Sequence, residues 1–299
     1  MKVSDQRLFD LLLEADEEAF LGGEDVKQRS WSAPQRVMSK LGYVSYVLAG
    51  VGVPAELSRL HEMQKQLYRP QDTGVGGVHL GTFMFRDVFA KITVPIGFGQ
   101  VAIDPFKVTD LNEMQCRWLA SRGADFGAFL DQFIDLFDFG YGLIELGHTR
   151  SVGEDCKSLL GLAHFQLQAA AAIVTGAYDF RGAIQCSLVA TELVLKAGLA
   201  ASGVAESKRR KFGHDLEALA HSLSRQEATM DSARVVATVT SFPDYVDNRY
   251  AAEQPGRRET GHIVMGAQYV GAEVMRQFTD RDLRSSITPS LVRSYPHAE

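Results

Sequence analysis

Long apolar segments with few internal charges dominate the second half of the chain. Between residues 182 and 200 the only ionisable side chains are Glu192 and Lys196, whereas a helix at the surface of a soluble protein carries a broad polar face. We therefore expect this helix to lie at the centre of a bundle. Glu192 should have a partner there, because an unpaired buried carboxylate is costly or stays protonated. The apolar periodicity predicts helices over residues 155–177, 182–200, 214–224, 230–250 and 262–278.

The first half of the chain alternates helical patterns with glycine-rich breaks. A turn-rich segment, residues 71–81, is expected to be a mobile loop. Strand patterns at residues 92–94 and 100–103, on either side of a Pro- and Gly-containing segment, predict a small hairpin. Helices are predicted over residues 5–20, 32–49 (with Pro34 in its first turn), 54–68, 110–120 and 125–146.

Two of these predictions determine the organisation of the chain. Residues 147–153 are polar and bracketed by two glycines, which is typical of a domain boundary. In the helix over 230–250, the run Val235 to Val239 favours a strand locally, but a bundle offers no sheet for it to join. The sequence thus predicts a mainly α protein, with a mostly helical domain over 1–147 that holds a hairpin near 92–103, a helical bundle over 153–278 and a flexible tail over 279–299.

Composition narrows the class of protein. The formal net charge of −6 divides into −5 for residues 1–150 (15 basic minus 20 acidic) and −1 for residues 151–299 (16 minus 17). Neither half has the broad basic excess of a protein that holds duplex DNA by phosphate contacts. The three cysteines form no CxxC pair, and acidic residues follow Leu13 immediately, which a secretory leader does not tolerate. We expect a soluble, cytoplasmic protein with no membrane span.

Short motifs in the bundle half resemble those of one known family. They are Ala190-Thr191-Glu192-Leu193, Leu195-Lys196-Ala197, His214-Asp215-Leu216 and Arg249-Tyr250. Their order and spacing resemble the HEPN family over about residues 153–276. The resemblance implies an up-and-down helical bundle, frequently dimeric, found in prokaryotic toxin, defence and nucleotide- or RNA-handling contexts. Some HEPN members are metal-independent ribonucleases, and many have no known activity.

Glu192, His214 and Arg209 are the candidate catalytic residues. Glu192 and Lys196 have the i,i+4 spacing of a helix ion pair, which is either structural or part of a site where Glu192 orients an imidazole from the next helix. His214 lies at the expected start of that helix, whose dipole favours the neutral imidazole that a general base needs. Arg209 precedes His214 with four residues between them, as in the Arg-x(4–6)-His pattern of catalytic HEPN members. There the resemblance implies that the arginine stabilises the developing phosphorane charge.

The catalytic interpretation has an alternative, in which His214 is structural or contacts a nucleotide. Positions five apart on a helix diverge by about 140°, so Arg209 and His214 converge only if the segment between them is partly non-helical, whereas Arg210 would share the face of His214. His221 is seven residues beyond His214, which is not the spacing of a metal pair. We expect neither a metal nor a cofactor.

The candidate ligand-binding residues are basic or lie at helix ends. Lys208, Arg210 and Lys211, together with Arg249, would form a phosphate-sized basic spot if the bundle brings them together, and a solvated loop if it does not. Asp215 suits the positive end of the predicted helix. Tyr250, next to Arg249, either packs against the preceding helices or belongs to the same site.

Three functions remain open on these residues. The first is a HEPN-like RNA- or nucleotide-binding interaction protein in a prokaryotic defence or toxin–antitoxin context. The second is a metal-independent endoribonuclease that uses Arg209 and His214, with Glu192 in support. The third is a structural scaffold that binds a protein partner through its N-terminal half. We also expect a homodimer formed through the bundle, because Gly266 and the pattern Ala267-x-x-x-Gly271 permit close helix approach.

Overall fold

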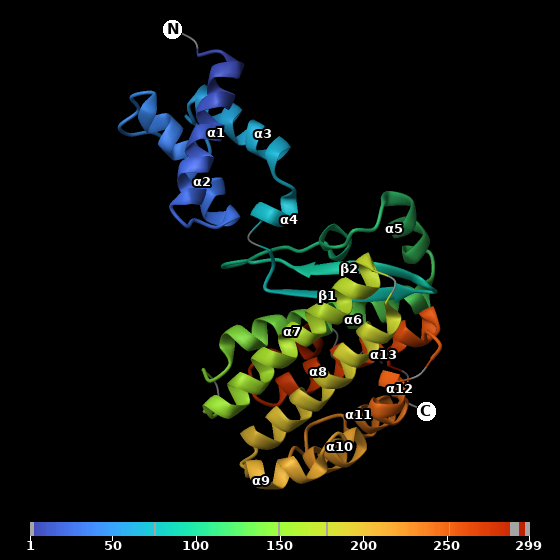
Figure 1. Ribbon diagram of the computed structural model, residues 1–299. Coiled ribbons are helices and arrows are strands. Elements are labelled where there is room, and N and C mark those ends of the chain that lie inside the picture. Colours follow the sequence, from blue (N-terminus) through green and yellow to red (C-terminus); the bar gives the residue numbers. More distant parts are fainter. Residues whose placement is uncertain are drawn as a thin grey trace. The chain divides into compact units, whose positions relative to one another are not determined.

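The chain folds into two compact units, residues 1–76 and 77–299. The computed structural model (Figure 1) describes residues 3–74, 76–148, 150–177, 179–250, 252–287 and 293–296. Helices dominate these described segments, whose one sheet consists of two antiparallel strands. The predicted fold class, mainly α with a small hairpin, is confirmed.

The first unit is a small helical cluster. Its core consists of leucines from α1 and α3 and of apolar residues from α2. The prediction of a helix over 32–49 is wrong at both ends, because α2 begins at Val26 with a capping box on Asp25 and ends at Lys40. Gly42, with φ 90°, ends it through the hydrogen bonds of a Schellman motif. The helices of this unit are α1 (Asp5–Leu21), α2 (Val26–Lys40), α3 (Ala55–Leu67) and α4 (Pro70–Thr73).

The second unit begins with the hairpin. Strand β1 (His79–Phe85) pairs with β2 (Val88–Val94) through a two-residue turn. The prediction placed residues 92–94 in a strand correctly but paired them with 100–103, which form no strand. A two-residue turn fixes the register with the preceding segment instead. The predicted mobile loop over 71–81 contains α4 and the start of β1, although Val75 lies outside the described residues.

Four long helices form the body of the second unit. Helix α13 (Arg257–Arg276) is buried along most of its length and packs against α6 (Gly123–Glu145) and α8 (Phe180–Ala201). Helix α7 (Glu154–Gly176) packs along α8, and β1 contacts α6, α7 and α13, as Figure 1 shows. The shorter helices are α5 (Glu113–Ala120), α9 (Glu206–Arg209), α10 (Leu216–Ser224), α11 (Ser232–Thr240), α12 (Tyr245–Tyr250) and α14 (Leu283–Ile287), with 3₁₀ turns η1 (Pro105–Val108) and η2 (Arg210–Phe212).

The helix predicted over 230–250 is broken into α11 and α12. Residues Val235 to Val239 are helical, as predicted over the local strand preference. The break follows at Phe242 and Pro243, because proline has no N–H to donate and disfavours the α conformation of the residue before it.

The domain boundary predicted at 147–153 lies inside the second unit. Helix α6, which precedes it, packs directly on α13, and Gly142 allows this approach, since a Cβ there would lie 2.3 Å from Cγ of Met275. The boundary is at residues 76–77 instead.

The tail predicted to be flexible is partly packed against α6. Asp135 of α6 is fully buried and pairs with both Arg276 and Arg293, and Asp131 pairs with Arg284. Tyr295 is 7% exposed. The described part of the tail is therefore attached by buried ion pairs that join segments more than a hundred residues apart.

Helices α7 and α8 are, by length and composition alone, long and apolar enough to cross a membrane. Length and composition therefore do not by themselves support the expectation of no membrane span. Within the structure, 61% of the apolar window of α8 is buried, as in a core helix. The buried share of the apolar window of α7 is 33%.

Candidate functional site

Glu192 has the partners that the sequence predicts. Its side chain is 13% exposed, and its two oxygens lie 2.5 Å from Nζ of Lys196 and 2.7 Å from Nδ1 of His214. Lys196 also donates to the carbonyl of Gly213 at 2.9 Å. Because the carboxylate engages Nδ1, the ring of His214, 58% of which is exposed, keeps Nε2 for a ligand or for solvent.

His214 lines a cavity of about 570 Å³ together with residues from α8, α10 and α12. Its ring stacks on Tyr245, with ring centroids 4.6 Å apart. Helix α10 begins two residues after His214, and Asp215 is its N-cap, accepting a hydrogen bond from the N–H of Ala218 at 2.9 Å. Four carboxylates line the cavity, those of Glu192, Asp215, Glu217 and Asp244. This excess of acidic groups makes the cavity a poor receptor for phosphate.

Arg209 does not line the cavity of His214. It is buried, and its guanidinium pairs with Asp155 of α7 and donates to the carbonyls of Val204 (3.0 Å) and Lys196 (3.4 Å). The segment between Arg209 and His214 is non-helical from Gly213 onward, as convergence would require. Within one chain, however, Arg209 of α9 contacts α7 and α8 and so joins these three helices.

The other predicted basic residues are not gathered around His214. Lys208 and Lys211 are exposed, and Arg210 pairs with Glu206 at 2.5 Å. Arg249 lies over the ring of Tyr250 at 5.8 Å, at the exposed end of α12. The described residues that line the cavity of His214 include none of these predicted ligand-binding residues: Lys208, Arg210, Lys211, Arg249 and Tyr250.

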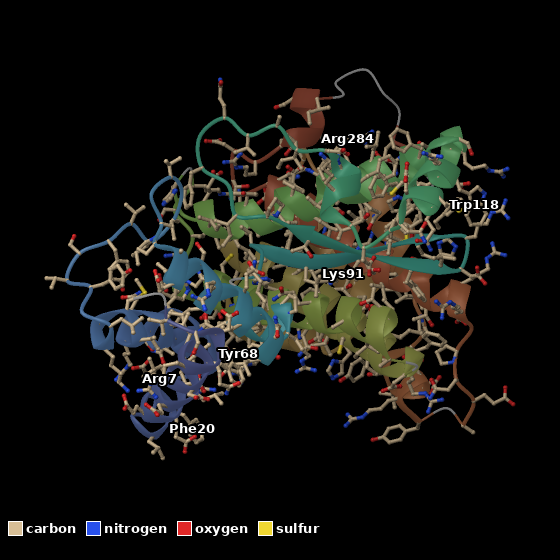
Figure 2. The ribbon with its side chains drawn as sticks, turned by 90° about the horizontal axis from the view of Figure 1, so that it is seen from above. Arg7, Phe20, Tyr68, Lys91, Trp118 and Arg284 are labelled. Atoms are coloured by element: carbon tan, nitrogen blue, oxygen red, sulfur yellow. The ribbon has the colours of Figure 1, made fainter. Side chains whose placement is uncertain are left out.

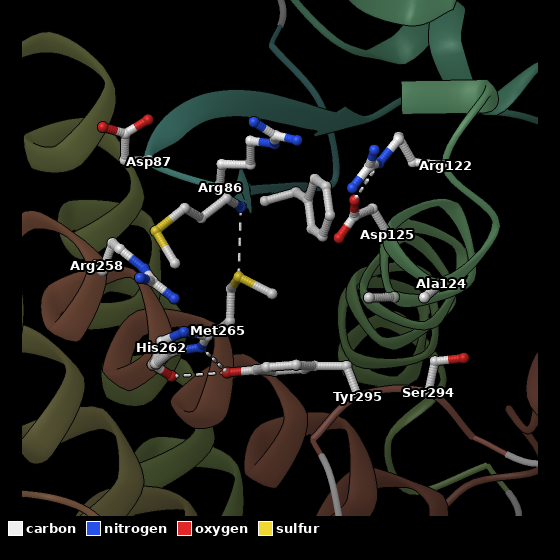
Figure 3. A pocket seen from close by; sticks show the side chains of 13 residues that line it. Arg86, Asp87, Arg122, Ala124, Asp125, Arg258, His262, Met265, Ser294 and Tyr295 are labelled. Atoms are coloured by element: carbon white, nitrogen blue, oxygen red, sulfur yellow. Dashed lines mark hydrogen bonds and ion pairs between the residues drawn. The ribbon is translucent and has the colours of Figure 1, made fainter. Parts of the chain in front are cut away.

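A second cavity, of about 630 Å³, has the opposite chemistry. We call it the arginine cavity, because Arg86, Arg122 and Arg258 line it from three different elements. Figure 3 shows Arg86 above it on the hairpin turn, Arg122 before α6, Arg258 and His262 on α13, and Tyr295 below. Asp87 and Asp125 are its only carboxylates among the described lining residues.

Arg86 occupies a strained position. It is the first residue of the two-residue turn, with φ 61°, and it is the one non-glycine residue with positive φ in the described segments. Glycine is the usual residue there, since a side chain costs about 1–2 kcal/mol in this conformation. The guanidinium of Arg86 lies 5.0 Å over the ring of Trp118 on α5, which also contacts Phe85 at the end of β1. Figure 2 labels Trp118. Arg257 fixes the turn by donating to the carbonyl of Asp87.

The start of α6 contributes further positive potential. Its N-cap, Arg122, makes no side-chain capping bond, so the first N–H groups of the helix are left without one. Arg122 lies 3.6 Å from Asp125, whereas Arg86 and Arg258 make no ion pair with a described residue. The cavity therefore combines three guanidinium groups with two carboxylates, and one of each, Arg122 and Asp125, already engage each other.

Tyr295 forms the lower wall of the arginine cavity. Its hydroxyl donates to the carbonyl of His262 at 3.0 Å, and its ring lies parallel to the imidazole, with centroids 6.0 Å apart. Burial raises the pKa of Tyr295 above its usual range. This residue is therefore a neutral, apolar surface beside the charged rim.

The sequence carries a signal for this site that our prediction missed. Arg122 is the N-cap of α6 and the pair Arg257-Arg258 begins α13, at helix starts where the dipole favours acidic residues. Arg86-Asp87 between two apolar runs marks the hairpin turn. Only the folded structure, however, shows that the starts of α6 and α13 and the hairpin turn lie around one cavity.

Comparison with known proteins adds no assignment to this geometry. No family model, curated protein or solved structure matches the chain.

Proposed function

We propose that this protein binds a nucleotide, with the phosphate group held in the arginine cavity. The observation that supports the proposal is the meeting of Arg86, Arg122 and Arg258 at one cavity of about 630 Å³, a volume in the range of small-ligand pockets. Guanidinium groups bind phosphate with charge-assisted hydrogen bonds. The resemblance to HEPN proteins, which belong to nucleotide- and RNA-handling systems, supports the same ligand class.

The two cavities differ in a way that decides where a phosphate would bind. At the His214 cavity, Lys196 is already bound to Glu192, and Glu217 and Asp244 add negative charge. At the arginine cavity, Arg258 is exposed and makes no ion pair with a described residue. Each hydrogen bond to a charged group contributes about 1.5–3 kcal/mol, so two or three such bonds from the rim offset a repulsion of about 4 kcal/mol from one unpaired carboxylate about 4 Å away near the surface.

Isothermal titration with AMP, ADP, ATP and GTP tests the proposal. We expect binding that weakens with salt and an Arg258→Ala variant that binds at least tenfold more weakly, which corresponds to about 1.4 kcal/mol. Arg210→Ala is the matched control, because Arg210 is exposed, pairs with Glu206 and lies outside the cavity. If a 5′-phosphorylated RNA competes with the nucleotide for this site, RNA is also a ligand, as the resemblance to HEPN proteins implies. Affinity that is equal in wild type and Arg258→Ala would refute the site.

A second candidate function is a metal-independent endoribonuclease. The geometry that favours it is the 2.7 Å contact between Glu192 and Nδ1 of His214, which orients the ring as a general base. Arg209 would supply the cation, but its buried pairing with Asp155 opposes that role. Such an enzyme would cleave RNA in excess EDTA, leave cyclic or 3′-phosphate ends and spare DNA. His214→Ala should lower the rate by about 10²–10⁴, and undiminished cleavage by that variant would exclude the mechanism.

The context of the protein is part of the same proposal. We infer a cytoplasmic homodimer in a prokaryotic defence or toxin–antitoxin system, in which the first unit serves to bind a protein partner. Its dimer interface would differ from the one expected, because Gly266 and Gly271 pack inside the chain, against Phe242 and Phe139 respectively. Light scattering at micromolar concentration tests the dimer, and a monomer there would contradict it.

A further inference from the structure

Arg86 combines three properties that a purely structural residue has no need to combine. Its backbone has φ 61°, in the left-handed region that glycine normally fills. Its side chain is exposed at the rim of the arginine cavity, and it makes no ion pair with any residue in the described segments. A strained conformation persists only where its surroundings hold it, and such positions cluster at ligand sites.

Two aromatic side chains lie against the guanidinium group of Arg86. The group lies 5.0 Å from the ring centre of Trp118 and 6.0 Å from that of Phe85. These two rings contact each other edge to face at 4.5 Å, and Trp118 is 41% exposed. The guanidinium therefore has aromatic support and lines the arginine cavity, as its position in Figure 3 shows.

We infer that Arg86 stacks on the flat base of the bound nucleotide, with Trp118 supporting it, while Arg122 and Arg258 hold the phosphate. This inference rests on the proposed function and narrows its ligand class to nucleoside phosphates, as opposed to inorganic phosphate, pyrophosphate or a sugar phosphate. A planar guanidinium stacks on nucleobases, and an aromatic ring next to it adds a cation–π contact.

The chemistry of the other cavity residues supports this division. Arg258 and Arg122 lie next to the first turns of α13 and α6, where exposed N–H groups and the helix dipole favour an anion. Arg86 lies on the hairpin turn and not in a helix, and it is the one of the three arginines with a described aromatic partner. If charge were its only role, a lysine would serve as well, and neither the aromatic support nor the strained turn would be needed.

Two substitutions at residue 86 test the inference, with ADP and pyrophosphate as probes. Arg86→Lys keeps the charge and removes the flat surface, so its affinity for ADP should fall by about ten- to a hundredfold. Its affinity for pyrophosphate should stay within about threefold, because only the stacked base is lost. Arg86→Gly relieves the turn, so we expect an unchanged or higher melting temperature without ligand together with the same loss of ADP affinity.

The spectroscopic arm of the test uses the two tryptophans of the chain. In a Trp31→Phe background the remaining tryptophan is Trp118, whose fluorescence should be quenched by ADP and not by pyrophosphate. Equal loss of ADP and pyrophosphate binding in Arg86→Lys, or no loss of either, would overturn the stacking and leave the nucleotide site in place. A melting temperature of Arg86→Gly several degrees below wild type would identify Arg86 as structural. Wild-type protein that binds none of the nucleotides would refute the proposed function itself.

Discussion

Buried ionisable side chains of the second unit are accommodated in two different ways. Asp135, fully buried, accepts from Arg276 at 2.7 Å and from Arg293. His79 is 1% exposed, and neither ring nitrogen has a hydrogen-bond partner among the described residues. Burial, together with His164 at a centroid distance of 5.0 Å, lowers the pKa of His79 to about 3. The aspartate is paired with two guanidinium groups, whereas the histidine is held neutral mainly by its burial.

The neutral state of His79 predicts an acid-sensitive fold. The unfolded chain takes up a proton at His79 near pH 6.5, but the folded chain does so only near pH 3. The contribution of His79 to the unfolding free energy should therefore be fully present above pH 6.5 and fall with pH, by about 2 kcal/mol at pH 5. Urea denaturation across this range measures it. His79→Phe should flatten the profile, and His221→Gln, at an exposed position, should leave it unchanged. An equal slope in His79→Phe would show that other groups cause it.

Arg293 should be a major stabilising residue despite its place near the C-terminus. Arg293→Ala leaves Asp135 buried with one of its two guanidinium partners, and breaking a buried ion pair costs about 3–5 kcal/mol. Arg281→Ala is the control, because its pair with Glu145 is partly exposed and should contribute under about 1 kcal/mol. Chemical denaturation of both variants compares them, and similar losses would indicate that the tail is not anchored at Asp135.

At the scale of elements, close approach between helices and the hairpin depends on glycines. A Cβ on Gly142 of α6 would lie 2.3 Å from Cγ of Met275 in α13, and one on Gly81 of β1 would lie 2.1 Å from a methyl group of Leu136 in α6. Helix α13 is thereby brought against α6. The same packing brings the start of α13, with Arg258, to the start of α6, with Arg122. The arginine cavity is thus a consequence of how these elements pack.

Two glycine substitutions separate packing from helix propensity. Gly142→Ala forces Met275 to move and should destabilise the fold by about 1–3 kcal/mol. Gly161→Ala, in α7, meets no atom within 4 Å and should stabilise it by about 0.5–1 kcal/mol, because alanine restricts the unfolded chain and favours helix. Thermal melting of both variants gives the comparison. A stabilising Gly142→Ala would mean that α6 and α13 are less closely packed than described.

At the scale of the molecule, the division of the chain does not fall at the polar segment 147–153. Residues 77–299 form one unit in which α6 and β1 cover α13. The segment at 147–153 joins two helices of that unit, so its glycines mark a connection between helices and not the end of a domain.

Truncation tests this organisation directly. A fragment of residues 77–299 should unfold in one cooperative transition and keep the nucleotide affinity of the whole chain, since every residue of the arginine cavity lies within it. A fragment of residues 148–299 should fail to fold, because it exposes the faces of α13 that α6 and β1 cover. Circular dichroism and limited proteolysis distinguish the two. A cooperative melt of the shorter fragment would restore the boundary at 147–153.

The sequence by itself determined what depends on local periodicity and on single costly groups. Apolar repeats identified the long helices, and the lone Glu192 in an apolar helix required a partner, which the structure supplies as Lys196 and His214. Where the prediction failed, the deciding contacts join distant residues. Strand pairing depended on a two-residue turn, and the tail depended on Asp131 and Asp135, about 150 residues earlier, whose burial no local pattern reveals.

Only the tertiary structure decided which charged groups meet. Arg209 and His214 are close in sequence, yet the fold buries the guanidinium against Asp155 and leaves the imidazole at an acidic cavity. Arg86, Arg122 and Arg258 are far apart in sequence, and the packing of the hairpin, α6 and α13 brings them to one cavity. The physical reason is that a side chain's local pattern sets its secondary structure, whereas the potential at a site is the sum over all charges that the fold places around it.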